Sequence, residues 1–285
     1  MAALPTLEIS QKDSPGVNFL YRTLPGRMVL RLLICPGISK AAGSFLDWRI
    51  SRFLIGPFIR TGHIPMDDYE KVPYISFNDF FTRQVRPGLR ALPEDFAVPF
   101  APCDGKLTAY PITEDARFHI KHSTYDLSQL LGDASLAEAF RGGTCLIFRL
   151  TPDDYHRYVF PDSGRQLCCR KIPGVLHTVR PIAFDRYPVY TQNAREYALL
   201  ETEHFGSVIQ MEVGALFVGR IVNRPVSGPF HRGQEKGMFQ FGGSTIVLLF
   251  QKDAVEIDPI FFENTHNNRE TIVKMGCPLG KRTTT

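Results

Sequence analysis

Four short stretches of this 285-residue chain hold residues that could do acid–base or nucleophilic chemistry. They are PCDGKL around Asp104, PDDYHRYVFPDSG around His156, PGVLHTVRP around His177, and the Gly243-Ser244 step in FQFGGSTIVLLF. A carboxylate, an imidazole and a hydroxyl are the groups from which a base-activated nucleophile is built. Each stretch alone has an ordinary explanation, since Asp-Gly favours a turn and a strand histidine is often structural. The four together are a specific combination.

The segment from Phe239 to Phe250 also reads as a β-hairpin. Gly242-Gly243 accepts positive φ at no steric cost, and apolar residues alternate on both sides of it. We therefore expect a two-residue turn between two paired strands. The question is whether Ser244 is only part of that turn.

Common signatures of other enzyme classes are absent from the sequence. There is no G-x-G-x-x-G, no P-loop, no H-E-x-x-H and no G-x-S-x-G. His119 and His122 would point to opposite faces of an extended segment and have no third ligand nearby, so we expect no metal site. The net charge of +4 and the lack of a recognised motif argue against a nucleic-acid partner.

From about Phe77 to its C-terminus the chain resembles the phosphatidylserine decarboxylase family. The motifs that carry the resemblance are FNDFFTR, PCDGK, DYHRY, VGALFVGRI and GMFQFGGST. The resemblance implies a proenzyme that cuts itself between Gly243 and Ser244. Ser244 would become a covalent pyruvoyl cofactor, and the enzyme would convert phosphatidylserine to phosphatidylethanolamine and CO₂. Alternatives are a decarboxylase of a free amino acid and an inactive lipid-binding relative.

Elementary chemistry explains why such a cut needs these residue types. The Ser244 hydroxyl is one residue from the Gly243 carbonyl, so attack converts the peptide bond to an ester. Gly242 and Gly243 lack β-carbons and let the backbone adopt the strained geometry. Elimination from the ester and hydrolysis then give pyruvoyl and ammonia. The pyruvoyl ketone accepts the electrons released with CO₂, and the protein supplies position and protons.

The resemblance also implies roles for individual residues. Asp104 matches the aspartate of the self-cleavage relay, and His156 matches the first histidine of the family's Y-H-R-x-H-x-P element, which is tied to decarboxylation. The second histidine of that element would fall at Val159, and valine cannot transfer a proton. Either His156 serves both steps, or His177 takes the relay role. Our sequence-based preference is His177.

Basic and apolar residues alternate through the N-terminal region. Residues 18–60 carry seven Arg and Lys side chains against the single acid Asp47, and Leu46, Ile50, Phe53 and Leu54 have helical spacing. Pro and Gly divide the region into two or three short helices. Such helices suit either an anionic membrane surface or a cap on the core. With phosphatidylserine as substrate, we expect membrane docking.

The remaining sequence predicts an α+β fold with a mostly antiparallel sheet. We expect a helical, membrane-associating region over 1–75 and a core domain over 76–285, with a helix from Ser76 that ends at Pro87-Gly88. One helical patch, DLSQLLGDASLAEAFRGG, interrupts the strands. Adjacent Cys168 and Cys169, and the absence of a secretory signal, favour a reducing compartment and a peripheral protein on a cytoplasm-facing membrane. Its own two fragments and a second copy of the chain are the expected protein partners.

Overall fold

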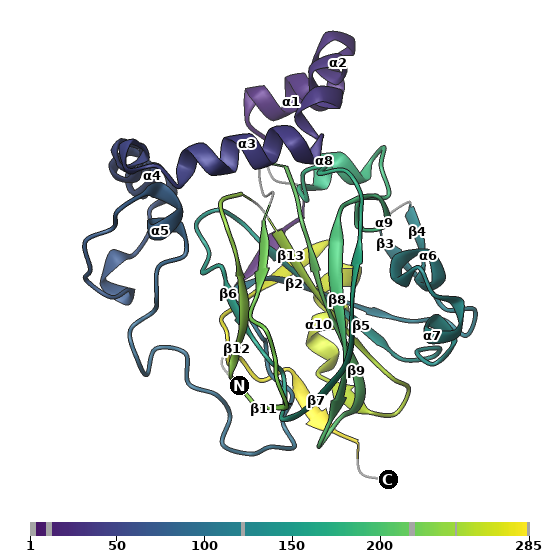
Figure 1. Cartoon of the computed structure of the whole chain (residues 1–285). Coiled ribbons are helices and arrows are strands. Elements are labelled where there is room, and N and C mark those ends of the chain that lie inside the picture. The colour runs from purple at the N-terminus through teal and green to yellow at the C-terminus, as the bar shows by residue number, and fades with distance from the viewer. Residues whose placement is uncertain (1–3, 10–12, 121–122, 217–219, 243, 284–285) are drawn as a thin grey trace.

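A computed structural model of the chain describes residues 4–9, 13–120, 123–216, 220–242 and 244–283. Its largest element is an antiparallel sheet of nine strands. Together with the helices, this sheet confirms the predicted α+β class (Figure 1). In spatial order these strands are β1 (Thr6–Glu8), β15 (Arg269–Val273), β2 (Gly105–Pro111), β5 (Thr144–Leu150), β13 (Ser244–Phe250), β9 (Gly206–Val213), β8 (Arg195–Thr202), β7 (Gly164–Ile172) and β11 (Pro229–Phe230).

Smaller sheets surround this large one. One has the order β10 (Ile221–Asn223), β12 (Glu235–Phe239) and β6 (Arg157–Val159). Two others have two strands each: β14 (Val255–Ile257) with β16 (Gly280–Arg282), and β3 (Arg117–Ile120) with β4 (Ser123–Asp126). The short helices of the core are η2 (Met66–Asp68), α5 (Phe77–Phe81), α6 (Leu127–Leu131), α7 (Ala134–Glu138), α8 (Pro181–Phe184), α9 (Val189–Gln192) and α10 (Pro259–His266).

Strand β13 lies at the centre of the large sheet and is buried on both faces. It pairs with β5 on one side and β9 on the other, and all seven of its residues are buried. Ile246, Leu248 and Phe250 belong to one core, whereas Val247 and Leu249 belong to the core on the opposite face. The continuous apolar run STIVLLF is what a strand covered on both faces requires.

The predicted hairpin between Phe239 and Phe250 is wrong. Strand β12, which ends at Phe239, pairs with β6 and β10 in the small sheet and not with β13. Both edges of β13 are already occupied by β5 and β9, so no edge is left for β12. The segment after Phe239 therefore carries the chain from one sheet to another. Gly243, the residue before the predicted cut, lies outside the described residues.

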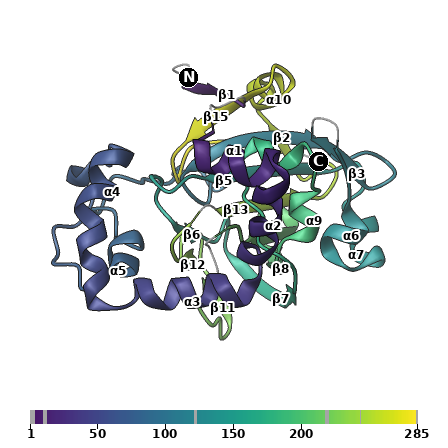
Figure 2. The ribbon, with the colours of Figure 1, turned by 90° about the horizontal axis from the view of Figure 1, so that it is seen from above.

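The N-terminal helices lie at one end of the sheet (Figures 1 and 2). They are α1 (Pro15–Arg22), α2 (Leu24–Leu33), α3 (Pro36–Leu46), η1 (Arg49–Leu54) and α4 (Ile55–Gly62). The predicted short helices are present, but the stripe from Leu46 to Leu54 is not one helix face. The chain is extended at Trp48, and Ile50 and Phe53 are more than 60% exposed. Strand β1 and buried Tyr21 and Leu30, which the sequence did not predict, tie this region to the core.

Two further helix predictions need correction. The helix expected from Ser76 to Pro87 ends at Phe81, because the backbone leaves the helical conformation at Thr82; Arg83, which follows, is 2% exposed. The helical patch after Asp126 is two short helices, α6 and α7, separated by Gly132 at φ 61°. A residue in that left-handed conformation ends a helix.

Candidate active site

The sheet register brings the starts of β2 and β13 to the same end of the sheet. Lys106 of β2 pairs with Arg149 of β5, and the next residue of β5, Leu150, pairs with Ser244 of β13. Asp104 directly precedes β2. The two strand spacings between β2 and β13 correspond to about 10 Å. Asp104 and Ser244, which are 140 positions apart in sequence, thus lie at the same end of the sheet.

Ser244 is fully buried at the first position of β13. Its Oγ has no hydrogen-bond partner among the described residues, and neither has the Oγ1 of Thr245. Nearly all buried hydroxyls are hydrogen-bonded, so an unpartnered one calls for an explanation, and a catalytic role is one of those known. Two residues earlier, Gly242 has φ 131°, a conformation essentially restricted to glycine. The hydroxyl at the predicted cut is therefore buried, uncommitted and next to unusual backbone.

His156 is held in one tautomer with one nitrogen free. Its Nδ1 lies 2.9 Å from the carbonyl oxygen of Asp154, and a carbonyl can only accept, so Nδ1 carries the proton. The other ring nitrogen, Nε2, is buried without a partner among the described residues. Burial lowers the pKa of His156 to about 4, against the opposing charge of Asp154. At neutral pH the ring is uncharged, and Nε2 can accept a proton.

This lowered pKa predicts an unusual pH profile for a reaction that uses His156 as base. The rate should stay flat as pH falls through about 6.5, where an exposed histidine protonates, and should decline only near the pKa of about 4. The folded pKa is below the unfolded one, so the stabilisation from this group is complete above about 6.5 and is lost toward 4. The measurement is the rate of self-cutting at each pH, from samples quenched at successive times and run on denaturing gels. Only buffers in which circular dichroism shows a folded chain are used. A rate that falls with a midpoint near pH 6.5 would contradict the prediction.

Backbone and ring contacts place His156 beside the segment that leads to the predicted cut. The Phe239 amide donates to the carbonyl oxygen of His156 at 2.9 Å. The ring of Phe81 lies 4.2 Å from the ring of His156 and 5.3 Å from that of Phe241. His156 is therefore enclosed by α5 and by the connection from β12 to β13.

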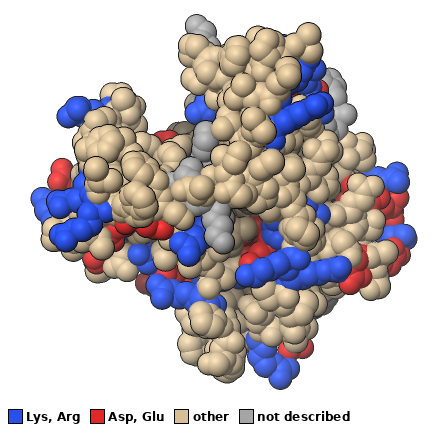
Figure 3. Space-filling model, turned by 45° about the horizontal axis from the view of Figure 1, so that its top comes forward, with Lys and Arg blue, Asp and Glu red and all other residues tan. Residues whose placement is uncertain are grey.

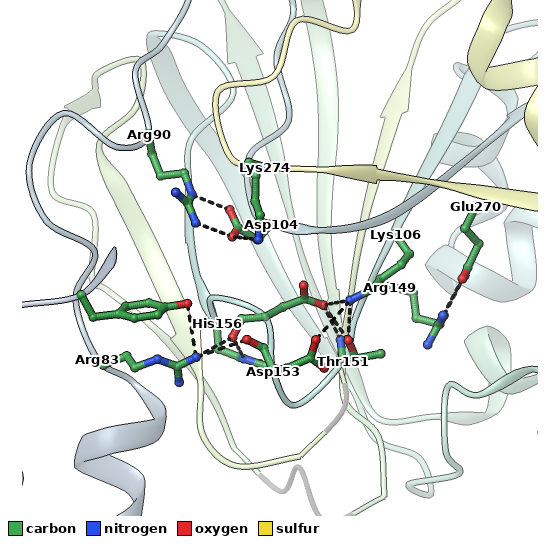
Figure 4. A network of polar contacts seen from close by, with 12 residues as sticks. Arg83, Arg90, Asp104, Lys106, Arg149, Thr151, Asp153, His156, Glu270 and Lys274 are labelled. Atoms are coloured by element: carbon green, nitrogen blue, oxygen red, sulfur yellow. Dashed lines mark hydrogen bonds and ion pairs between the residues drawn. The ribbon is translucent and has the colours of Figure 1, made fainter. Parts of the chain in front are cut away.

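Arg83 is a residue of this site whose role the sequence did not show. Its guanidinium donates to the carbonyl oxygen of Asp153 at 3.3 Å (Figure 4). It also donates to the carbonyl oxygen of Asp154 at 3.4 Å and lies over the Tyr69 ring. Lys106 holds the same loop from the other side through the Asp154 carboxylate at 2.6 Å. Both residues belong to recognised motifs, FFTR and DGK, but only the fold reveals that they fix the loop that orients His156.

The carboxylate of Asp104 is buried and surrounded by basic side chains. Arg90 donates to both of its oxygens at 2.9 and 2.8 Å, and Lys274 lies 3.1 Å away (Figure 4). The Met275 amide also donates to it at 2.9 Å. Burial alone would raise the pKa of Asp104, but the hydrogen bonds and charges of Arg90 and Lys274 hold it below the usual range. The contacts of the described residues do not join Asp104 to His156 or to Ser244.

Val159 lies against the loop that carries Asp104. Its amide donates to the Pro102 carbonyl oxygen at 3.0 Å, and its own carbonyl accepts from Gln210 Nε2 at 3.1 Å. A histidine here would be next to the Asp104 loop. In this chain Arg90 pairs with both oxygens of the Asp104 carboxylate.

His177 lies apart from this network, beneath the N-terminal helices. Its ring stacks on Tyr187 at 4.1 Å, its Nδ1 lies 3.4 Å from the Tyr21 hydroxyl, and its backbone is held by Asn193. The Tyr21 hydroxyl accepts the Thr178 amide at 2.9 Å, which leaves its own proton for Nδ1. No contact within the described ranges links either histidine to Ser244. His156 does contact the segment that leads to the predicted cut, through the Phe239 amide and the Phe81 ring, whereas the contacts of His177 lie on Tyr21, Tyr187 and Asn193.

Asn78 connects Phe241, in the segment that leads to the predicted cut, to the N-terminal helices. Its amide group donates to the Gly43 carbonyl oxygen at 3.0 Å and to the Asp47 carboxylate at 2.9 Å, and its Oδ1 accepts the Phe241 amide at 3.3 Å. The motif FNDFFTR contained this residue, but no local pattern could reveal contacts with positions so distant in sequence.

Comparison with known proteins gives a consistent family. The phosphatidylserine decarboxylase family profile matches residues 77–281. Over 272 residues the chain is 46% identical to "Phosphatidylserine decarboxylase proenzyme 2" of Clostridium acetobutylicum, covering 95% of this chain and 93% of the relative. It is 41% identical to a phosphatidylserine decarboxylase proenzyme of Ruminiclostridium cellulolyticum over 93% of this chain and 90% of that protein. The resemblance seen in the motifs is confirmed: the chain belongs to the phosphatidylserine decarboxylase family.

Proposed function

We propose that this chain cuts its own backbone between Gly243 and Ser244 and then decarboxylates phosphatidylserine to phosphatidylethanolamine and CO₂. The main structural support for the proposed cut is the Ser244 hydroxyl, which is buried at the start of the central strand and has no partner among the described residues. Family membership supports the reaction and its substrate class.

In the proposed cut, His156 Nε2 takes the proton of Ser244 Oγ while Oγ attacks the carbonyl carbon of Gly243. The carbon–nitrogen bond breaks, the amine of residue 244 takes the proton, and an ester replaces the peptide bond. Removal of the Cα proton of residue 244 then expels the Gly243 carboxylate and leaves dehydroalanine. Water hydrolyses that residue and releases ammonia. Arg83 and Lys106 act by holding the loop that aims His156.

The residues around position 244 fit a pyruvoyl group, because the position is buried and its oxygen is not committed to another partner. Such a group supplies an electron sink for the electrons left when CO₂ departs. The chain's own contribution is positional. Pairing with β5 and β9 fixes the start of β13, and the neutral imidazole of His156 can hold or return a proton in a buried site.

The two fragments of the proposed cut would stay together as one fold. The fragment from residue 244 contributes β13 to the centre of the large sheet, between β5 and β9 of the other fragment. It also contributes β15, which lies between β1 and β2. Separation would expose strands that are buried on both faces, so we expect the fragments to part only on denaturation.

We place the membrane contact on the N-terminal helices. Large apolar side chains are exposed there, among them Met28 at 71%, Trp48 at 64% and Phe53 at 63%. From this end the helices present a mostly uncharged surface with basic side chains at its margins (Figure 3). Apolar groups flanked by arginines suit an anionic bilayer surface. Within the described residues no single helix is long and apolar enough to cross a membrane; α2 and α3 would reach that length only together, bent by 65°.

Trp48→Glu with Phe53→Glu should reduce binding to anionic vesicles by about tenfold or more, because each change places a charge where an apolar side chain enters the interface. Self-cutting should remain normal, since both side chains are exposed. Leu167→Glu is the matched control: this residue is 53% exposed but lies on β7. Equal pelleting of the double variant and the control would refute the assignment of the surface.

The substrate is tested with purified, cut protein and two carboxyl-labelled compounds, phosphatidylserine in vesicles and free serine. We expect labelled CO₂ from the lipid alone, because the apolar helical surface serves only a substrate held in a membrane. Release from free serine at a comparable rate would favour a soluble amino-acid decarboxylase. A cut chain that releases CO₂ from neither would count against the proposed reaction.

A further inference from the structure

A basic hollow beneath α2 is not used by the proposed chemistry. Its volume is about 630 Å³, and it lies between α2 and the segment around Tyr187, with His177 among its lining residues. Three arginines line it, Arg27, Arg31 and Arg186, and no lining residue is acidic. A hollow of this size accommodates a small polar group with part of an attached chain.

The arginines of this hollow lack carboxylate partners. Nearby Arg180 pairs with Asp13 at 3.5 Å, but no ion pair holds Arg27, Arg31 or Arg186 within the described residues. Arginines without carboxylate partners that line one concave site are suited to a phosphate, whose oxygens guanidinium groups can bind in pairs. The positive charge of the hollow therefore favours binding of an anion.

The surroundings indicate that this anion belongs to a lipid. Leu24 and Met28 also line the hollow and are 72% and 71% exposed, and Leu32 on the same helix is 63% exposed. A phosphodiester in the hollow would leave its acyl chains beside these apolar side chains. A free phosphate would gain nothing from them.

The hollow lies on a different side of the sheet from the proposed cut. Tyr187 and Ile34 pack against the core that contains Val247 and Leu249. Ser244 alternates with Ile246 and Leu248, whose side chains belong to the opposite core. The hollow is thus separate from the face toward which Ser244 Oγ points.

We propose that the hollow lined by Arg27, Arg31 and Arg186 binds the phosphodiester of an anionic glycerophospholipid in the docked membrane, apart from the lipid that is decarboxylated. This inference rests on the proposed membrane-associated function and assigns it a specific second lipid site. His177 then contributes to a binding site and not to the cleavage relay.

The test compares two double variants that remove equal charge, one from the lining of the hollow and one from the N-terminal helices outside it. Arg27→Gln with Arg186→Gln changes the lining, and Arg22→Gln with Arg49→Gln changes exposed arginines that do not line the hollow. Full-length protein is pelleted with phosphatidylglycerol–phosphatidylcholine vesicles and with pure phosphatidylcholine vesicles. We expect the lining variant to lose at least about tenfold more affinity for the anionic vesicles than the control, beyond the general attraction of two charges to the surface. Millimolar glycerol 3-phosphate should not displace the wild-type protein.

Equal losses in the two variants would overturn the inference, because general electrostatic attraction would then account for binding. Displacement by glycerol 3-phosphate would show a site for soluble phosphate and would overturn it as well. Self-cutting of each variant is scored on a denaturing gel. Normal cutting of the lining variant is expected, and its loss would place the hollow in the cleavage machinery. Failure of the proposed function would appear separately, as an uncut wild-type chain.

Discussion

Ser244→Ala is expected to give a full-length chain with no decarboxylase activity. The variant removes the oxygen that attacks the Gly243 carbonyl and the only atom from which the ester can form. A peptide bond without a positioned nucleophile is inert on the timescale of expression. The measurement is a denaturing gel of freshly purified protein together with CO₂ release from labelled phosphatidylserine.

Thr245→Val is the matched control for this variant. Thr245 is also fully buried, also carries an unpartnered hydroxyl, and is the next residue of the same strand, but it faces the opposite core. Valine keeps its shape, so the variant should fold and cut. A cut Ser244→Ala chain would remove Ser244 from the mechanism, and an uncut Thr245→Val chain would show that cutting depends on general order in β13.

Substitution of His156 is expected to have the second large effect. His156→Ala should slow self-cutting by at least about a hundredfold, the usual contribution of a positioned general base. The free Nε2 and the lowered pKa are both lost in this variant. The measurement is the time course of cutting after translation in a cell-free system, followed on denaturing gels.

His177→Ala separates this account from the relay that the sequence alone favoured. His177 is also buried and also has a pKa lowered by burial to about 4, so the two variants are matched in burial and titration. We expect His177→Ala to cut at the normal rate. The reverse pattern, with His156→Ala cut and His177→Ala uncut, would restore His177 as the relay base and refute our assignment.

The sequence predicted the family and the fold class better than the pairing of the strands. The predicted α+β class is confirmed, and so are the strands predicted where β5, β9 and β13 lie. Their long apolar runs leave few alternatives to a buried strand. The hairpin prediction failed because Gly-Gly favours a tight turn locally, whereas strand pairing is decided by the whole sheet. Nothing within the segment shows that β5 and β9 occupy both edges of β13.

The contacts that orient the candidate site are equally non-local. Arg83 reaches residues 70 positions away, and Asn78 joins α3 to Phe241, so no spacing pattern could show either role. The choice between His156 and His177 also depended on the fold. Our preference for His156 rests on contacts that only the fold supplies: the Phe239 amide on the His156 carbonyl oxygen, and the Tyr21 hydroxyl and Tyr187 ring on His177.

Self-cutting at Ser244 is the central claim, and the intact mass of the purified wild-type chain under denaturing conditions tests it most directly. We predict two species, one of residues 1–243 and one of residues 244–285 that is lighter by one ammonia than the unmodified fragment. That deficit is the signature of serine converted to pyruvoyl. A single species with the mass of all 285 residues, or a second fragment that retains an unmodified serine, would contradict the account.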